Sequence, residues 1–100
     1  MIISKLREIE KESILRKIPI IGSEKGSWLY QQVIKIKPKK ILELGTANGY
    51  SGIILGSNGG ELTTIEINKK IAREAEVNFK KFKINSKIIV GDGEKEIKKI

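Results

Sequence analysis

The chain has 100 residues with 20 basic and 12 acidic side chains, a formal net charge of +8, and no cysteine or histidine. This length fits one small domain, and the missing residue types exclude a disulfide scaffold, a thiol nucleophile, a zinc–thiolate site and the commonest general base. No apolar run approaches the ~18 residues of a membrane span and no signal peptide is recognisable, so we expect a cytoplasmic protein without a membrane partner.

Two amphipathic helices are predicted before the first strand. Apolar residues recur at helical spacing over residues 2–17 and again over residues 23–36, and a proline follows each stretch. The residue before a proline avoids helical dihedral angles, so each helix should end there. Ser23 is expected to cap the second helix. Residues 1–37 are therefore predicted to form an N-terminal helical segment.

From residue 38 onward, short apolar runs alternate with helical patterns. Asn68 is expected to cap one of these helices, and Asn85 to adopt a left-handed conformation in a turn. The alternation predicts an α/β fold, a Rossmann-like three-layer sandwich over residues 38–100. It is half of a doubly wound parallel sheet with strand order 3-2-1. The predicted strands are residues 41–44, 62–67 and 87–90, and the predicted helices are residues 50–55, 68–82 and 94–100.

The most informative segment is ELGTANGYSG, residues 43–52, where the first strand turns into a helix. Gly45 and Gly49 let the backbone approach a ligand, and the start of the helix offers unpaired N–H groups to an anion. The spacing G-x-x-x-G differs from the G-x-G-x-x-G of dinucleotide binders. Larger residues between the glycines suit a smaller anion, such as a carboxylate.

Two further features lie at the ends of the other predicted strands. Glu66 lies 21 positions after Gly45, where doubly wound sheets place an acid that accepts hydrogen bonds from ribose hydroxyls. Asp92 and Gly93 follow the third strand, beside the expected position of an adenine ring. Because open α/β sheets bind ligands at the carboxyl ends of their strands, all three features predict one site.

At these residues the chain resembles the class I S-adenosylmethionine-dependent methyltransferases. Within them it is most similar to the O-methyltransferase family that includes catechol and caffeoyl-CoA O-methyltransferases. The matching segments are ILELGTANGYS at residues 41–51, TIEI at 64–67 and VGDG at 90–93, with a weaker similarity in SEKG at 23–26. The resemblance covers roughly residues 22–100. It implies the N-terminal, cofactor-binding half of such an enzyme, as a truncated chain or as one part of a split enzyme.

The resemblance implies S-adenosyl-L-methionine as the cofactor and assigns roles around its methionine part. Glu43 would orient the amino group, and Gly45 would let the chain pass beneath the cofactor. Tyr50 and Ser51 would help to hold the carboxylate at the start of the helix.

Around the adenosine part, the resemblance implies that Glu66 takes the ribose diol while Ile67 packs against the adenine. Asp92 and Gly93 would lie at the adenine edge, although the family often has a smaller residue at the position of Asp92. The complete set of implied cofactor contacts is Glu43, Gly45, Thr46, Ala47, Asn48, Gly49, Tyr50, Ser51, Glu66, Ile67, Asp92 and Gly93.

The same resemblance implies a small-molecule acceptor but assigns no catalytic residue here. The divalent cation that family members can use would find no ligands among these residues, because the family carries them further along the chain. The predicted strand Ile41–Leu44 is apolar and would lie at the edge of the half-sheet. Exposed apolar edges pair with other chains, so we expect a second chain or a homo-oligomer to cover it.

Three alternatives remain open at this point. Lysines at positions 35, 37, 39, 40, 80, 81, 83 and 87 are compatible with an RNA acceptor, although they are spread over several elements without interleaved aromatic residues. A non-catalytic remnant that acts through a partner chain is the second alternative. The third, a nicotinamide dinucleotide enzyme, is disfavoured by the spacing of the glycines.

Overall fold

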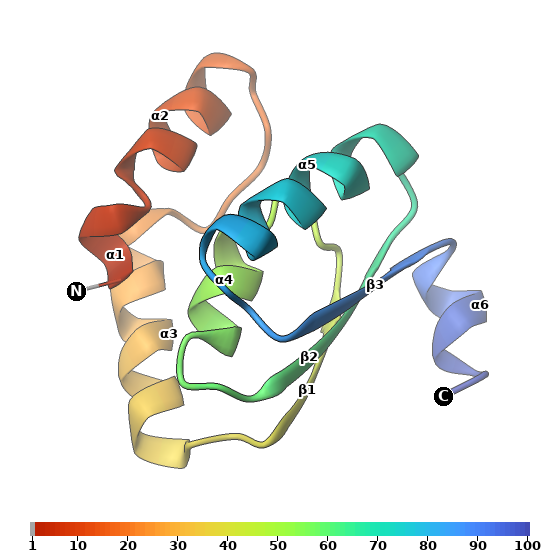
Figure 1. Cartoon of the computed structure of the whole chain (residues 1–100). Coiled ribbons are helices and arrows are strands. Elements are labelled where there is room, and N and C mark those ends of the chain that lie inside the picture. The colour runs from red at the N-terminus through yellow and green to blue at the C-terminus, as the bar shows by residue number, and fades with distance from the viewer. Residues whose placement is uncertain (1) are drawn as a thin grey trace.

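Three parallel strands form the centre of the molecule, with helices on both faces (Figure 1). The computed structural model describes residues 2–100. The strands follow one another across the sheet in the order β1-β2-β3, which confirms the predicted parallel half-sheet. They are β1 (Lys40–Leu44), β2 (Glu61–Glu66) and β3 (Ser86–Val90).

The helices lie in two layers. In the first layer α4 and α5 pack against one face of the sheet and α3 packs beside α4, whereas α6 lies on the other side of the sheet (Figure 1). The helices are α1 (Ile2–Lys5), α2 (Arg7–Leu15), α3 (Gly22–Ile36), α4 (Tyr50–Gly56), α5 (Lys69–Lys81) and α6 (Gly93–Ile97). This arrangement is the predicted three-layer sandwich. None of the helices among residues 2–100 is long and apolar enough to cross a membrane.

One hydrophobic core joins the N-terminal helices to the sheet. It includes Ile3, Leu6 and Ile9 together with Tyr50 of α4 and Phe79 of α5, all of them buried. Segments 1–37 and 38–100 therefore share their packing, and the division of the chain between them stays a prediction.

The first helix is interrupted, so the continuous helix predicted over residues 2–17 is wrong. Leu6 separates α1 from α2, and its N–H donates to the carbonyl of Ile3, three residues back. A three-residue turn tightens the chain beyond the 3.6 residues of an α-helical turn. It lets Ile3, Leu6 and Ile9, which are spaced by three, all point into the core.

Two of the three predictions about turns and caps are wrong. Helix α3 begins at Gly22 without any side-chain cap, so Ser23 lies inside the helix. Asn85 is not left-handed; Lys83 is, with φ of 56°. A helix commonly ends with a left-handed residue directly after its C-cap, and the C-cap of α5 is Phe82. The predicted cap at Asn68 is confirmed, because its side chain accepts a hydrogen bond from the Ile71 N–H at 3.1 Å.

The outer edge of β1 is open. In the described part of the chain, no strand pairs with β1 on the side away from β2. The Lys39 carbonyl and the Gly45 N–H bond to β2, so the backbone groups of Lys40, Leu42 and Leu44 point outward by alternation. The side chains of Leu42 and Leu44 are 45% and 56% exposed. This edge thus combines free backbone groups with apolar surface.

Candidate ligand-binding site

The connection between β1 and α4 is a tight loop with three left-handed residues. Gly45, Ala47 and Gly49 have φ values of 84°, 48° and 96°. A Cβ atom at Gly45 would meet no atom within 4 Å, whereas one at Gly49 would lie 3.1 Å from Cε1 of Phe79. Gly45 therefore borders open space where a ligand can approach. Gly49 instead permits the loop to pack against α5.

The carboxylate of Glu66 holds this loop to the end of β2. The Ala47 N–H donates to Oε1 of Glu66 at 2.8 Å, and the Asn68 N–H donates to Oε2 at 2.9 Å. Two features far apart in the sequence, the glycine loop and the acid, thus lie together at the carboxyl ends of the strands. The prediction that the glycine loop and Glu66 belong to one site requires them to lie close together.

The second carboxylate of the site, Glu43, is held by hydroxyl groups. Ser51 Oγ donates to Glu43 Oε2, and Thr64 Oγ1 donates to Glu43 Oε1 at 2.8 Å. The Thr46 hydroxyl lies 2.7 Å from Thr64 Oγ1. Since the hydrogen of Thr64 is used for Glu43, Thr46 must donate to Thr64. The hydroxyls of Ser51 and Thr64 therefore point toward the Glu43 carboxylate, and Thr46 supports the orientation of Thr64.

Burial raises the pKa of Glu43 above its ordinary value. The hydrogen bonds from Ser51 and Thr64 oppose the rise in pKa, and the nearby charge of Glu66 adds to it. No lysine or arginine forms an ion pair with Glu43 among residues 2–100. A carboxylate with hydrogen bonds but without a cation favours a positively charged ligand group, because that group would offset the cost of burial.

The N-terminal helices hold the glycine loop from the opposite side. The Asn48 amide donates to Ser13 Oγ at 2.6 Å, and the Ser13 hydroxyl donates to the Ile9 carbonyl at 2.6 Å. From α5, Nδ2 of Asn78 donates to the Asn48 carbonyl at 2.8 Å. The Asn48 side chain is buried toward α2, and its Oδ1 has no partner in the described part of the chain. Asn48 thus fixes the loop to two helices.

A cavity of about 360 Å³ lies beside the loop. This volume falls within the range of ~300–1,000 Å³ that is usual for small-molecule sites. Six of the residues implied as cofactor contacts line it, namely Glu43, Gly45, Thr46, Ala47, Tyr50 and Ser51. Pro19, Ile20 and Ile21 form its other wall, together with Leu44. The sequence analysis did not predict these three residues. An apolar connection between two helices does indicate that the connection packs against another part of the molecule.

Tyr50 lines this cavity although its side chain belongs to the core. The side chain is buried, and its hydroxyl lies 3.5 Å from Oε2 of Glu10 on α2. Burial, helped by the charge of Glu10, raises the pKa of Tyr50 to about 12. The hydroxyl therefore stays protonated at neutral pH and connects α4 to the N-terminal helices.

The remaining predicted residues lie at the ends of β2 and β3. Ile67 follows Glu66 and is 69% exposed, so its apolar side chain is free to contact a ligand. Asp92 caps α6, because its Oδ1 accepts hydrogen bonds from the N–H groups of Glu94 and Lys95. Gly93 begins α6 close to Leu44. Within residues 2–100, no group of three or more His, Cys, Asp or Glu residues is placed to hold a metal ion.

Comparisons by sequence place the chain among known proteins. A family model described as O-methyltransferase matches residues 1–100. The chain is 46% identical over 59 residues to the protein-L-isoaspartate O-methyltransferase of Xylella fastidiosa (strain M12), a match of 57% of this chain and 28% of that protein. It is 35% identical over 63 residues to the enzyme of that name from Stenotrophomonas maltophilia (strain K279a), covering 63% of this chain and 28% of that protein.

Solved structures resemble the chain over most of its length. The O-methyltransferase of Bacillus cereus, crystallised in complex with SAH, superposes with a TM-score of 0.84 at 27% identity, covering 97% of this chain and 47% of that one. A SAH-bound methyltransferase of Podospora anserina gives a TM-score of 0.76 at 29% identity, covering 81% and 37%. The chain thus spans about a quarter of the curated relatives described above and less than half of these two solved structures.

Proposed function

Because this chain belongs to the O-methyltransferase family, we propose that it forms the S-adenosylmethionine-binding part of a methyltransferase whose acceptor atom is oxygen. The hydrogen bond of 2.8 Å between the Ala47 N–H and Glu66 carries the proposal. It joins the loop that borders open space to the acid that would take the ribose. Support for the cofactor comes from the two solved relatives described above, which were crystallised with SAH.

The residues at this site fit the chemistry of the cofactor. Glu43 is a buried carboxylate without a cationic partner in the described chain, which suits the ammonium of a methionine moiety. Gly45 faces open space, and the cavity beside it has a volume of about 360 Å³. Glu66 uses one backbone N–H for each carboxylate oxygen, so each oxygen keeps a lone pair for a ribose hydroxyl. The exposed Ile67 offers an apolar surface for an adenine ring.

When bound, S-adenosylmethionine supplies an electrophilic methyl group on a sulfonium sulfur. The residues of this chain would hold its two ends, Glu43 the amino acid and Glu66 the ribose. Such positioning matters because orientation supplies much of the rate in a direct transfer between bound reactants. We place no catalytic residue and no metal ligand in residues 1–100, and the activity of the whole protein is part of the proposal.

For the acceptor, we propose a small molecule with a nucleophilic oxygen. The curated relatives that match residues of this chain favour a second candidate, an isoaspartyl carboxylate in a protein. Methyl transfer to a catechol and to an isoaspartyl peptide, measured with labelled cofactor, distinguishes these two acceptors. An RNA acceptor is not favoured, because Lys37, Lys39 and Lys40 lie near the amino end of β1, away from the cavity.

The open edge of β1 supports a further part of the proposal, a partner strand. A strand from a second chain or another copy of this chain would satisfy the backbone groups of Leu42 and Leu44 and cover their side chains. Gel filtration of the wild type against a Leu42→Lys/Leu44→Lys variant tests this expectation. We expect the wild type to elute as an assembly and the variant as a smaller species, because charged edges resist pairing.

Calorimetry with S-adenosylhomocysteine tests the proposed cofactor site. Glu66→Ala should weaken binding by roughly ten- to a hundredfold, since hydrogen bonds to a charged group contribute about 1.5–3 kcal/mol. Glu61→Ala is the matched control, because Glu61 is the exposed acid at the other end of the same strand. Equal affinities for the two variants, or no binding by the wild type, would contradict the proposal.

A further inference from the structure

Much of the positive charge of the chain lies at one end of the molecule. The connections into the amino ends of the three strands span residues 35–40, 56–61 and 80–87, and we call their surface the basal face. It carries eight exposed lysines and one glutamate, whereas the net charge of the whole chain is +8. A merely lysine-rich composition would spread this charge over the whole surface. The fold instead concentrates it at the end opposite the candidate cofactor site.

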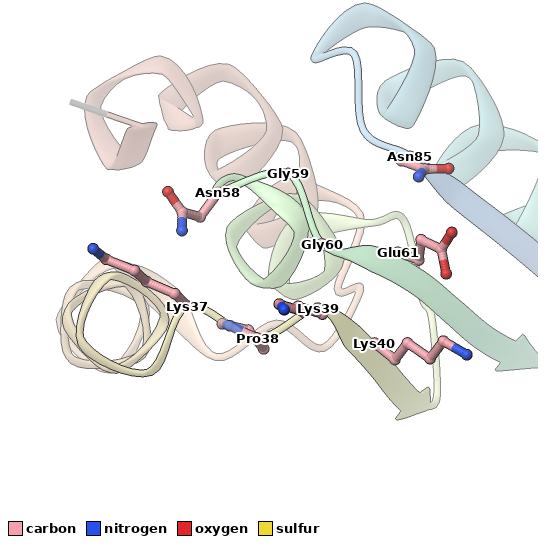
Figure 2. Close-up of a pocket in the computed structure, with 9 residues that line it drawn as sticks. All are labelled: Lys37, Pro38, Lys39, Lys40, Asn58, Gly59, Gly60, Glu61 and Asn85. Atoms are coloured by element: carbon pink, nitrogen blue, oxygen red, sulfur yellow. The ribbon is translucent and has the colours of Figure 1, made fainter.

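A recess of about 530 Å³ opens in the basal face, and residues from all three connections line it (Figure 2). Lys37, Lys39 and Lys40 come from the first connection, Asn58 from the second and Asn85 from the third. The turn at Gly60 packs tightly here, since a Cβ atom at Gly60 would lie 2.5 Å from the Pro38 carbonyl oxygen. Close packing of two connections therefore fixes the backbone that carries the lysines.

The three lysines of the recess are not neutralised. None of them forms an ion pair within the described residues, and Glu61, the only acid that lines the recess, pairs with none of them. Figure 2 shows the side chains leaving the backbone in different directions, with Lys37 on the side of Asn58 and Lys40 on the side of Glu61. Charges that diverge suit a ligand with several separated negative groups better than one small anion.

The chemistry of the lining distinguishes between kinds of polyanion. The side chains that line the recess are lysine, asparagine, glutamate and proline, with no aromatic residue. Protein interfaces usually have an apolar core, membrane-surface sites insert apolar side chains, and single-stranded nucleic acid stacks on aromatic rings. A recess lined by polar and basic side chains without aromatic residues is typical of contacts with the phosphates of a nucleic-acid duplex.

We propose that the basal face is a docking surface for the phosphate backbone of a nucleic-acid duplex, with Lys37, Lys39 and Lys40 as its centre. The proposal goes beyond the proposed function, because the docked nucleic acid would lie at the end of the sheet away from the cavity. The docked nucleic acid is therefore not the methyl acceptor. Docking there would leave the cofactor site accessible.

Fluorescence anisotropy with a labelled RNA hairpin tests this proposal across a range of salt concentrations. Each lysine–phosphate contact should add about 0.9 to the slope of log affinity against log salt, by analogy with duplex DNA. The triple variant Lys37→Gln/Lys39→Gln/Lys40→Gln should therefore bind more weakly and lose about 2–3 from that slope. The matched control Lys11→Gln/Lys25→Gln/Lys98→Gln removes the same charge from exposed positions elsewhere. It should keep most of the affinity and most of the salt slope of the wild type.

Several outcomes would overturn the proposal. Equal losses in the two triple variants would show that only net charge matters. Preferential binding of poly-glutamate or of phosphatidylserine vesicles, abolished by the first triple variant alone, would assign the face to an acidic protein or a membrane. Absence of binding at low salt, both to the RNA hairpin and to a DNA hairpin of the same length, would exclude duplex docking. Affinity for S-adenosylhomocysteine, measured on the same variants, should not change, and this separates failure here from failure of the proposed function.

Discussion

At the carboxyl ends of the strands Glu43 and Glu66 are held by other residues, whereas at the amino ends the three lysines of the recess form no ion pair within the described chain. Glu43 accepts hydrogen bonds from two hydroxyls, and Glu66 accepts them from two backbone N–H groups. Lys37 and Lys40 have no ion-pair partner among residues 2–100. Fixed groups suit one ligand of defined shape, since their orientation is set before binding. Free groups can adjust to a repeating ligand.

The prediction with the largest expected effect tests whether close packing at Gly60 fixes the backbone of the basal face. Gly60→Ala should cost about 2–3 kcal/mol of unfolding free energy, as overpacking typically does, because its Cβ would lie 2.5 Å from the Pro38 carbonyl oxygen. Urea denaturation measures this loss. Gly59→Ala is the control, since a Cβ there meets no atom within 4 Å. It should cost only the left-handed backbone penalty of about 1 kcal/mol, and equal losses would refute the role of close packing.

A second prediction concerns Glu43, at the carboxyl ends of the strands. It considers ligand binding and folding stability separately. Glu43→Gln should weaken S-adenosylhomocysteine binding by roughly ten- to a hundredfold, as expected for a lost charged hydrogen bond. Stability should respond differently. Burial raises the pKa of Glu43 above its ordinary 4.5, so the folded state holds its proton more tightly than the unfolded state. Glu43 therefore contributes to the free energy of unfolding at acid pH. This contribution is lost as the pH rises through the pKa of Glu43 in the folded state.

Thermal unfolding between acid and neutral pH checks the second half of that prediction. Glu43→Gln lacks the titrating carboxyl, so its melting temperature should fall less than that of the wild type as the pH rises. At neutral pH the variant should melt at or above the wild-type temperature. A variant that melts well below the wild type at neutral pH would show that the ionised carboxylate stabilises the fold.

The fold and the proximity of the glycine loop to Glu66 could be predicted because local patterns determine them. Alternating strands and helices, and glycines at 45 and 49, need only short stretches of sequence. The hydrogen bond between Ser13 and Asn48 could not be predicted in the same way, because it joins residues 35 positions apart. The break at Leu6 was missed for a related reason. Packing against α4, which lies far along the chain, decides where that helix tightens.

A third prediction compares the buried hydrogen bond of Ser13, near the carboxyl ends of the strands, with the part-buried hydrogen bond of Ser57, near their amino ends. Ser13→Ala should cost about 1–2 kcal/mol, because it leaves the buried Asn48 amide without its acceptor. Ser57→Ala removes one hydrogen bond, to the carbonyl of Ile54 near the amino ends, and should cost about 0.5–1 kcal/mol. Denaturation midpoints measure both. A larger loss for Ser57→Ala would contradict the view that the N-terminal helices hold the glycine loop.

The smallest effect concerns the backbone of the basal face. Lys37 adopts a left-handed conformation with φ of 52°, which costs most residues roughly 1 kcal/mol and glycine very little. Lys37→Gly should therefore raise the unfolding free energy by up to about 1 kcal/mol. Lys35→Gly removes the same charge from inside α3 and should lower it by about 1 kcal/mol. Shifts of the same sign would show that charge rather than conformation governs this end.

The hydrogen bond between the Ala47 N–H and Glu66 also makes the Ala47 amide a useful spectroscopic probe of the candidate site. Most protected amides exchange slowly with deuterium because a helix or a strand covers them, but this one is covered by a single carboxylate. Its exchange rate therefore follows the side chain at position 66 directly. Recording that one resonance with and without an added nucleoside therefore shows whether a ligand at the site changes the contact between the loop and Glu66.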